Sequence, residues 1–87
     1  MYQAVFSKRA ARFFLKIPLS DAKKIKKAII KLQKKPDSHG VIKLKVVPLG
    51  HYRYRVGDYR IIFDINNEMN ILEILDISRR SENTYKK

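Results

Sequence analysis

The chain has 87 residues, of which 20 are Lys or Arg and only 8 are Asp or Glu, so its formal net charge is +12. It contains no Cys, which excludes disulfides and thiolate metal sites. No apolar run reaches the roughly 18 residues of a membrane span, and no signal peptide opens the chain. We therefore expect one domain over residues 1–87, in a cytoplasmic protein with a polyanionic partner.

The positive charge is divided unevenly between the two halves of the chain. Residues 1–48 hold thirteen basic and two acidic residues, a net of +11, whereas residues 49–87 hold seven and six, a net of +1. Lysine dominates the first half and arginine the second. Lysine is a mobile point charge, whereas the guanidinium of arginine is a planar fork that matches phosphate oxygens. The pattern indicates that the first half attracts polyanions in general and that the second half binds phosphate groups more specifically.

The first half predicts a strand followed by two helices. Residues 2–6 are aromatic and β-branched, as in a strand, and Ser7 is suited to cap a helix that Pro18 ends. Ser20 and Asp21 have the chemistry to open a second helix. Each helix has one apolar stripe, formed by Ala10, Phe13, Phe14 and Ile17 in the first and by Ala22, Ile25, Ala28, Ile29 and Leu32 in the second. The short connection favours an antiparallel pair of helices.

The second half predicts three strands joined by turns. Residues 52–56, 59–65 and 69–77 are strand-like, and Gly57-Asp58 has hairpin-turn chemistry. The predicted order is β-α-α-β-β-β, an α+β fold in which a two-helix hairpin packs on one face of a small, mainly antiparallel sheet.

Alternation along the first of these strands separates two sets of side chains. Tyr52, Tyr54 and Val56 fall on one face and should meet the helices. His51, Arg53 and Arg55 fall on the other face, which we expect to be uncovered or to lie at the rim.

The residue types present favour metal-independent chemistry on RNA. The chain has no metal-ligand spacing, phosphate-binding loop or nucleophile elbow. Arginine can clamp a phosphate and stabilise developing charge, tyrosine can stack a base, and histidine can move a proton near neutral pH. Since RNA carries its own 2′-hydroxyl nucleophile, these residues are sufficient for a ribonuclease without any cofactor.

The stretch YRYRVGDYRIIF, residues 52–63, resembles the central hairpin of the RelE/ParE toxin superfamily, and the likeness extends over nearly the whole chain. RelE-like messenger-RNA endonucleases carry an arginine after the last strand and a tyrosine near the C-terminus, which ParE-like gyrase poisons generally lack. Arg80 and Tyr85 match that pair. The resemblance therefore implies a RelE-like toxin that cleaves messenger RNA on the ribosome, bound by an acidic cognate antitoxin.

The resemblance also implies roles for individual residues. Arg53 and Arg55 would occupy two basic positions of the nuclease site, and Arg60 would bind phosphate. Arg80 would stabilise the transition state, and Tyr85 would stack a base.

Two substitutes follow from the chain itself. The best-known nucleases have lysine where Arg53 and Arg55 stand, and arginine is a poor general base. His51, on the same predicted face, is the candidate base in their place, and Arg79 is a candidate to replace Arg80.

Plainer interpretations stay open for each of these residues. Arg53 and Arg55 fit solvated strand positions, Arg60 fits an ion pair with Asp64 or Glu73, His51 fits a surface loop, and Tyr85 fits a tail that docks on the sheet edge. The second helix carries a lysine face without acids, from which we predict RNA contacts by Lys23, Lys27 and Lys31. Two alternatives to the nuclease remain, a non-enzymatic gyrase inhibitor and an RNA-binding module with a degenerate site.

Overall fold

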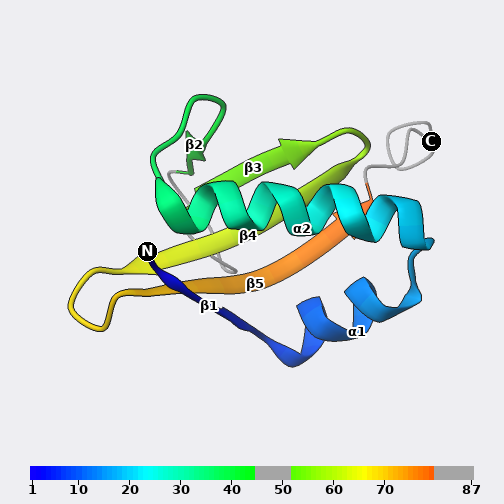
Figure 1. The fold of residues 1–87 in the computed structure, drawn as a ribbon, viewed down its shortest axis with the longest axis horizontal. Helices are drawn as coiled ribbons and strands as arrows, with labels where there is room; N and C mark the ends of the chain where they lie inside the picture. The colour runs from blue at the N-terminus through cyan, green and yellow to red at the C-terminus, as the bar shows by residue number, and fades with distance from the viewer. Residues whose placement is uncertain (45–51, 80–87) are drawn as a thin grey trace.

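The structure is a computed structural model that describes residues 1–44 and 52–79. Within these ranges the chain forms five strands and two helices (Figure 1). In chain order they are β1 (Gln3–Phe6), α1 (Lys8–Lys16), α2 (Leu19–Lys34), β2 (Ile42–Lys43), β3 (Tyr52–Val56), β4 (Tyr59–Asn66) and β5 (Ile71–Arg79).

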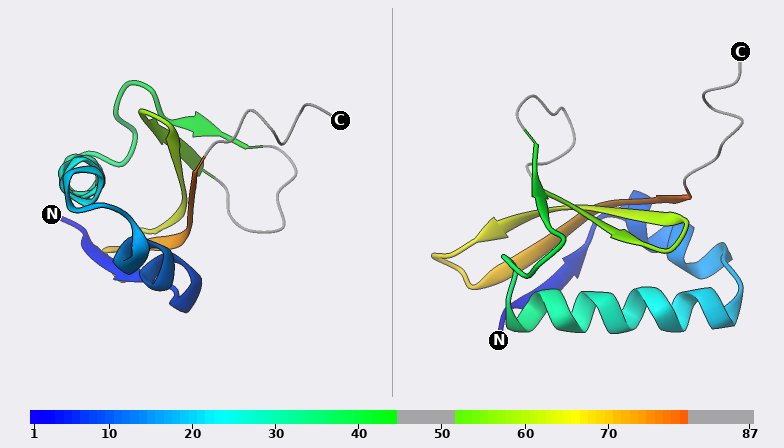
Figure 2. Two further views of the ribbon diagram at one scale, coloured as in Figure 1. Left: turned by 90° about the vertical axis from the view of Figure 1, so that its right-hand side faces the viewer. Right: turned by 90° about the horizontal axis from the view of Figure 1, so that it is seen from above.

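The strands form one sheet in the order β1-β5-β4-β3-β2. β1 runs parallel to β5, and the other neighbours are antiparallel. Both helices lie on the same side of the sheet, α2 along its length and α1 near β5 (Figure 2). The predicted α+β class and the mainly antiparallel sheet are confirmed. The two-residue strand β2 was not predicted, because so short a strand has no alternation to recognise.

The helix starts confirm one predicted cap and correct the other. Ser7 caps α1, since its Oγ accepts a hydrogen bond from the backbone N–H of Ala10 at 3.1 Å. The N-cap of α2 is Pro18, without any side-chain cap bond, so the prediction that Ser20 and Asp21 cap this helix is wrong. Both residues lie inside the first turn, where the carboxylate of Asp21 favours the helix dipole instead.

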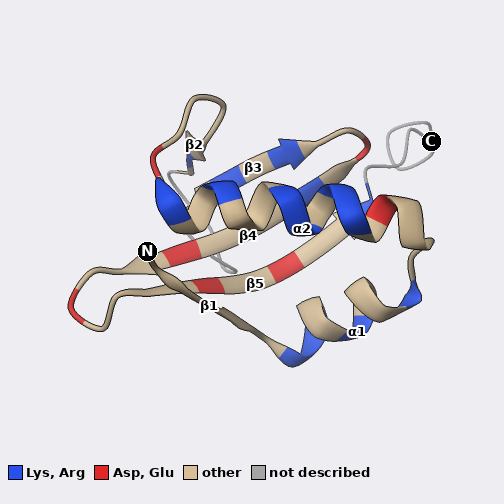
Figure 3. Cartoon of the chain, in the orientation of Figure 1, with Lys and Arg blue, Asp and Glu red and all other residues tan. Residues whose placement is uncertain are grey.

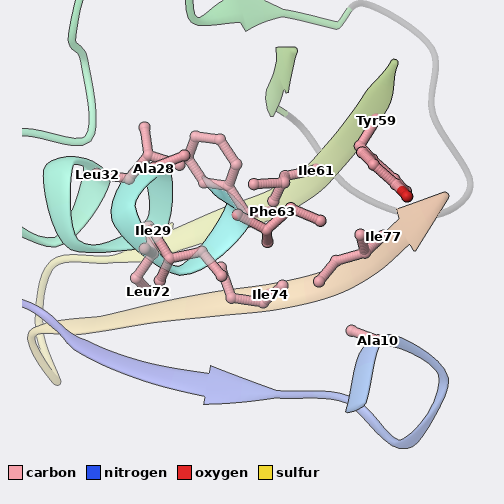
Figure 4. Close-up of a cluster of buried hydrophobic side chains, with 11 residues drawn as sticks. Ala10, Ala28, Ile29, Leu32, Tyr59, Ile61, Phe63, Leu72, Ile74 and Ile77 are labelled. Carbon is pink, nitrogen blue, oxygen red and sulfur yellow. The ribbon is translucent and has the colours of Figure 1, made fainter. Parts of the chain in front are cut away.

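The core lies between the helices and the sheet, where apolar side chains from four elements meet (Figure 4). The fully buried large side chains are those of Ile25, Leu32, Ile61, Phe63, Leu72, Ile74 and Ile77. On β4 the buried residues alternate with half-buried ones, as expected for a strand with one covered face. Among the described residues, no helix covers the opposite face of the sheet.

The last strand begins later than the sequence predicts, at Ile71 instead of Met69. Asn70 adopts a positive φ of 58°, and the side chain of Asn66 accepts a hydrogen bond from the Met69 N–H at 3.0 Å. These interactions extend the turn by two residues.

In the described ranges, neither helix combines the length and the apolar composition that a membrane crossing requires.

Candidate nucleic-acid interface

A tight hairpin brings three arginines onto the uncovered face of the sheet. Gly57 opens the β3–β4 turn with a φ of 57°, the conformation that a type II′ hairpin requires at this position. The register then sets Arg55 opposite Arg60, and Arg53 opposite Ile62. We call Arg53, Arg55 and Arg60 the arginine face.

The Arg55–Arg60 pair is the most distinctive electrostatic feature of this face. Directly opposed side chains of an antiparallel pair have Cβ atoms about 5 Å apart, and a pair of like charges at such positions is destabilising. Arg55 is exposed, whereas Arg60 is half-buried and the Nε of its guanidinium is buried. An anion bound between them would relieve the repulsion and accept hydrogen bonds from both.

Strand β5 completes two rows across the sheet. Ser78 lies opposite Arg60, which gives the row Arg55–Arg60–Ser78. Asp76 lies opposite Ile62 in the next row, and Arg9 of α1 approaches its carboxylate at 3.9 Å. Sequence reasoning missed Ser78, although alternation from the buried Ile77 places it on this face. Its hydroxyl adds a neutral donor beside the arginines.

Arg79 lies on the other face of the sheet from the arginine face. Its register partner is Tyr59, and its guanidinium carbon is 5.9 Å from the centre of the Tyr59 ring. A β-bulge between Ile62 and Phe63 shifts the β4–β5 register, so counting along one strand alone cannot establish this pairing. The sequence predicted that Arg79 binds RNA alongside the three arginines. The structure does not bring Arg79 together with them.

Tyr59 connects the end of the sheet to the helices. Its hydroxyl donates a hydrogen bond to the Asp21 carboxylate at 2.7 Å, and its ring packs edge-on against Phe13. The bond to Asp21, together with burial and the charge of that carboxylate, raises the pKa of Tyr59 above its ordinary value. These contacts hold the start of β4 against the helices. They therefore fix the backbone at Tyr59, the residue that directly precedes Arg60.

The predicted RNA-binding lysines belong to the other layer of the molecule. Lys23 and Lys27 are exposed. Figure 3 shows basic positions spread along α2. Lys31 points toward β3, where its Nζ donates to the Tyr54 hydroxyl at 3.1 Å and lies 5.3 Å from the centre of that ring. The lysines and the arginine face therefore do not form one continuous site on the sheet.

Three predicted site residues lie outside the described residues, namely His51, Arg80 and Tyr85. Among the described residues, no group of three His, Asp or Glu side chains is placed to hold a metal ion. The lining of a hollow of about 540 Å³ at the opposite end of the sheet from the hairpin includes three acids and one lysine, namely Asp64, Glu68, Glu73 and Lys43, and so carries a net negative charge. Its negative charge makes it unsuitable for a phosphate backbone.

Comparison with known proteins identifies the family to which this chain belongs. The family model described as the ParE toxin of the type II toxin–antitoxin system parDE matches residues 4–84. The chain therefore belongs to this family of toxins, within the RelE/ParE superfamily. No curated protein matches the chain.

Solved structures with the same fold are RelE toxins and their complexes. The RelBE2 toxin–antitoxin complex of Mycobacterium tuberculosis matches with a TM-score of 0.79 and 24% identity, over 91% of this chain and 98% of that one. The archaeal RelE–RelB complex of Pyrococcus horikoshii matches with a TM-score of 0.76 and 25% identity, over 93% and 97%. The isolated RelE toxin of E. coli matches with a TM-score of 0.78 and 19% identity, over 99% and 94%. These similarities confirm the fold.

Proposed function

We propose that this toxin is a metal-independent endoribonuclease that cleaves messenger RNA in the decoding site of the ribosome, in the cytoplasm. The observation that carries the proposal is the direct opposition of Arg55 and Arg60 on the uncovered sheet face, with Arg53 beside them. Two forked cations on rigid, adjacent strands suit a single phosphoryl group better than a diffuse polyanion. A rigid sheet also holds the donors in place during the reaction.

The proposed chemistry uses the nucleophile of RNA itself. The 2′-oxygen forms a bond to the adjacent phosphorus while the bond from phosphorus to the 5′-oxygen breaks, leaving a 2′,3′-cyclic phosphate. The proton of the 2′-hydroxyl passes to a base, and the departing 5′-oxygen takes up a proton. Arg55 and Arg60 would stabilise the charge that grows on the non-bridging oxygens.

Residues outside the described ranges would complete this site. Arg80 is proposed as a further donor to the phosphate, Tyr85 as the base-stacking residue and His51 as the general base, as the resemblance and the predicted strand face suggest. Arg53 would hold a neighbouring phosphate. The partner in the cell would be an acidic antitoxin, in keeping with the +12 charge and with the complexes among the structural neighbours.

The experiment is a reconstituted translation reaction with the purified toxin, in which primer extension maps the messenger ends. The proposal predicts new ends inside ribosome-bound codons, and none when ribosomes are omitted. Arg60→Ala should produce few such ends while keeping the fold. Intact messenger in the wild-type reaction would refute the proposal.

A second candidate function is inhibition of DNA gyrase without catalysis. The matching family model favours it, because its description is that of the ParE toxin. A gyrase supercoiling assay on the same protein preparation separates the two functions. Loss of supercoiling together with intact messenger would favour the gyrase inhibitor.

A further inference from the structure

Arg79 is the last residue of β5, and its side chain lies on the side of the sheet that carries the helices. Ser78 pairs with Arg60 and so lies on the arginine face. Arg79 and the buried Ile77, on either side of Ser78 in the chain, lie on the opposite face, because successive residues of a strand alternate. Arg79 pairs with Tyr59, and Figure 4 shows the Tyr59 side chain beside the end of β5. The guanidinium of Arg79 is therefore directed away from a phosphate bound on the arginine face.

A chain of contacts holds the Arg79 side chain on the helix side. Its guanidinium carbon lies over the Tyr59 ring, 5.9 Å from the centre, which is within the range of a cation–π interaction. The Tyr59 hydroxyl donates a hydrogen bond to the Asp21 carboxylate at 2.7 Å, and this bond polarises the phenol in the sense that favours a cation over its ring. Tyr59 is only 6% exposed, and the Phe13 ring packs against it, so the ring is a fixed support. We call Arg79, Tyr59 and Asp21 the strand-end anchor.

The strand-end anchor acts at the position where β5 would otherwise fray. Tyr59 and Arg79 form the pair at the end of the β4–β5 register, directly beside the pair of Arg60 and Ser78. Chain segments beyond the last pair of a sheet lose order unless contacts hold them. A contact at Arg79 therefore controls the orientation of the backbone both at Ser78 and at the point where the chain leaves the sheet.

We propose that Arg79 is a positioning residue: held against Tyr59 on the helix side, it directs Arg80 onto the arginine face. An extended chain alternates its side chains, so the residue after Arg79 leaves β5 on the face of Ser78. The two adjacent arginines then have different tasks, since the first holds the backbone and the second contacts the phosphate. The proposal rests on the proposed function, because it takes Arg80 as a donor to that phosphate.

This role differs measurably from two simpler ones. If Arg79 contacted RNA itself, its loss would weaken binding of the messenger and raise KM. If Arg79 only stabilised the fold, its loss would reduce cleavage in proportion to the unfolded fraction. A positioning residue acts after the substrate is bound, so its loss lowers kcat, leaves KM unchanged and has no further effect once Arg80 is absent.

The test measures kcat and KM for messenger cleavage on programmed ribosomes by the full-length toxin. Arg79→Ala should lower kcat by roughly two- to fivefold, the shift in an equilibrium that an exposed cation–π contact supports. Arg79→Lys keeps a cation over the ring and should recover most of this loss. In the Arg80→Ala background, a further Arg79→Ala should leave the residual rate unchanged. Arg12→Ala is the matched control, because it removes the same charge from an exposed position on α1 and should keep kcat.

A second measurement does not depend on cleavage. The backbone ¹⁵N order parameter of residue 80 should be lower in Arg79→Ala than in wild type, and Arg12→Ala should leave it unchanged. Melting curves of the same samples should show that Arg79→Ala stays folded at the assay temperature, since the side chain that it removes is exposed.

Four results would overturn the positioning role. They are a wild-type kcat in Arg79→Ala, a loss confined to KM, an equal fractional loss in the Arg80→Ala background, and an unchanged order parameter at residue 80. Normal cleavage by Arg79→Ala beside an active wild type would refute this role alone. Intact messenger in the wild-type reaction would refute the proposed function and this role with it, so the two failures are distinguishable.

Discussion

Replacing Arg60 by alanine separates catalysis from stability. Removing one preorganised donor to a developing oxyanion typically costs about 10²–10³ in rate, or roughly 3–4 kcal/mol of transition-state stabilisation. Arg60 is half-buried at the centre of the row formed with Arg55 and Ser78, where it can contact such a phosphate. We therefore expect messenger cleavage by Arg60→Ala to fall by about two to three orders of magnitude.

The effect on folding should be much smaller. Opposed like charges on a sheet destabilise it by roughly 0.2–1 kcal/mol, so losing one charge of the Arg55–Arg60 pair compensates for lost contacts of the side chain. A net change within about 1 kcal/mol shifts the melting temperature of a domain of this size by no more than about 4–8 °C. The interpretation of Arg60 as a structural ion-pair partner predicts the reverse, with a large drop in melting temperature.

Thermal melting and messenger cleavage should be measured on the same samples. Arg12→Ala is the matched control, because Arg12 is an exposed arginine on α1, away from the arginine face. It should retain both activity and stability. If Arg60→Ala cleaves messenger normally, or if its activity declines only in proportion to the unfolded fraction, the catalytic reasoning is refuted.

Three further predictions concern the core, the lysines and Tyr59. Ile25→Asp should destabilise the fold by several kcal/mol because it buries an unpaired carboxylate, whereas the exposed Ile30→Asp should melt close to wild type; equal melting curves would show that the core is misassigned. Single-stranded RNA binding should weaken with salt, with a log–log slope of roughly −3.5 for about five phosphates. That slope should become shallower when Lys23, Lys27 and Lys31 of α2 are changed to alanine. An unchanged slope would show that these lysines do not contact the RNA. Because the pKa of Tyr59 is raised in the folded state, its stabilisation is complete below about pH 10 and is lost as the pH rises through the raised pKa. Urea unfolding across this range should therefore show a smaller alkaline loss for Tyr59→Phe, and identical pH profiles would contradict the role of the bond to Asp21.

Local signals in the sequence were sufficient for most of the fold. Alternation on β3 placed Arg53 and Arg55 opposite the buried face, because one side of the sheet packs against helices. The cap at Ser7 and the turn at Gly57 depend on neighbouring residues alone, and both are present. Features of this kind are readable without knowledge of the tertiary structure.

Features that depend on distant residues were missed. The bond from Tyr59 to Asp21 joins residues 38 positions apart, so no local pattern indicates it. Arg79 was expected at the RNA from the family resemblance, because tail lengths vary between members, whereas its register partner is Tyr59 on the other face. Ser78 lies opposite Arg60 through the β4–β5 register, which joins residues far apart in the sequence.

The measurement that tests the central claim most directly compares two messengers in the reconstituted translation reaction. One is all ribose, and the other carries 2′-deoxyribose throughout the codon in the decoding site. Attack by the 2′-hydroxyl, stabilised by the arginine face, predicts cleavage of the first with a 2′,3′-cyclic phosphate end and no cleavage of the second. Equal cleavage of both messengers, or cleavage of neither, would contradict the account.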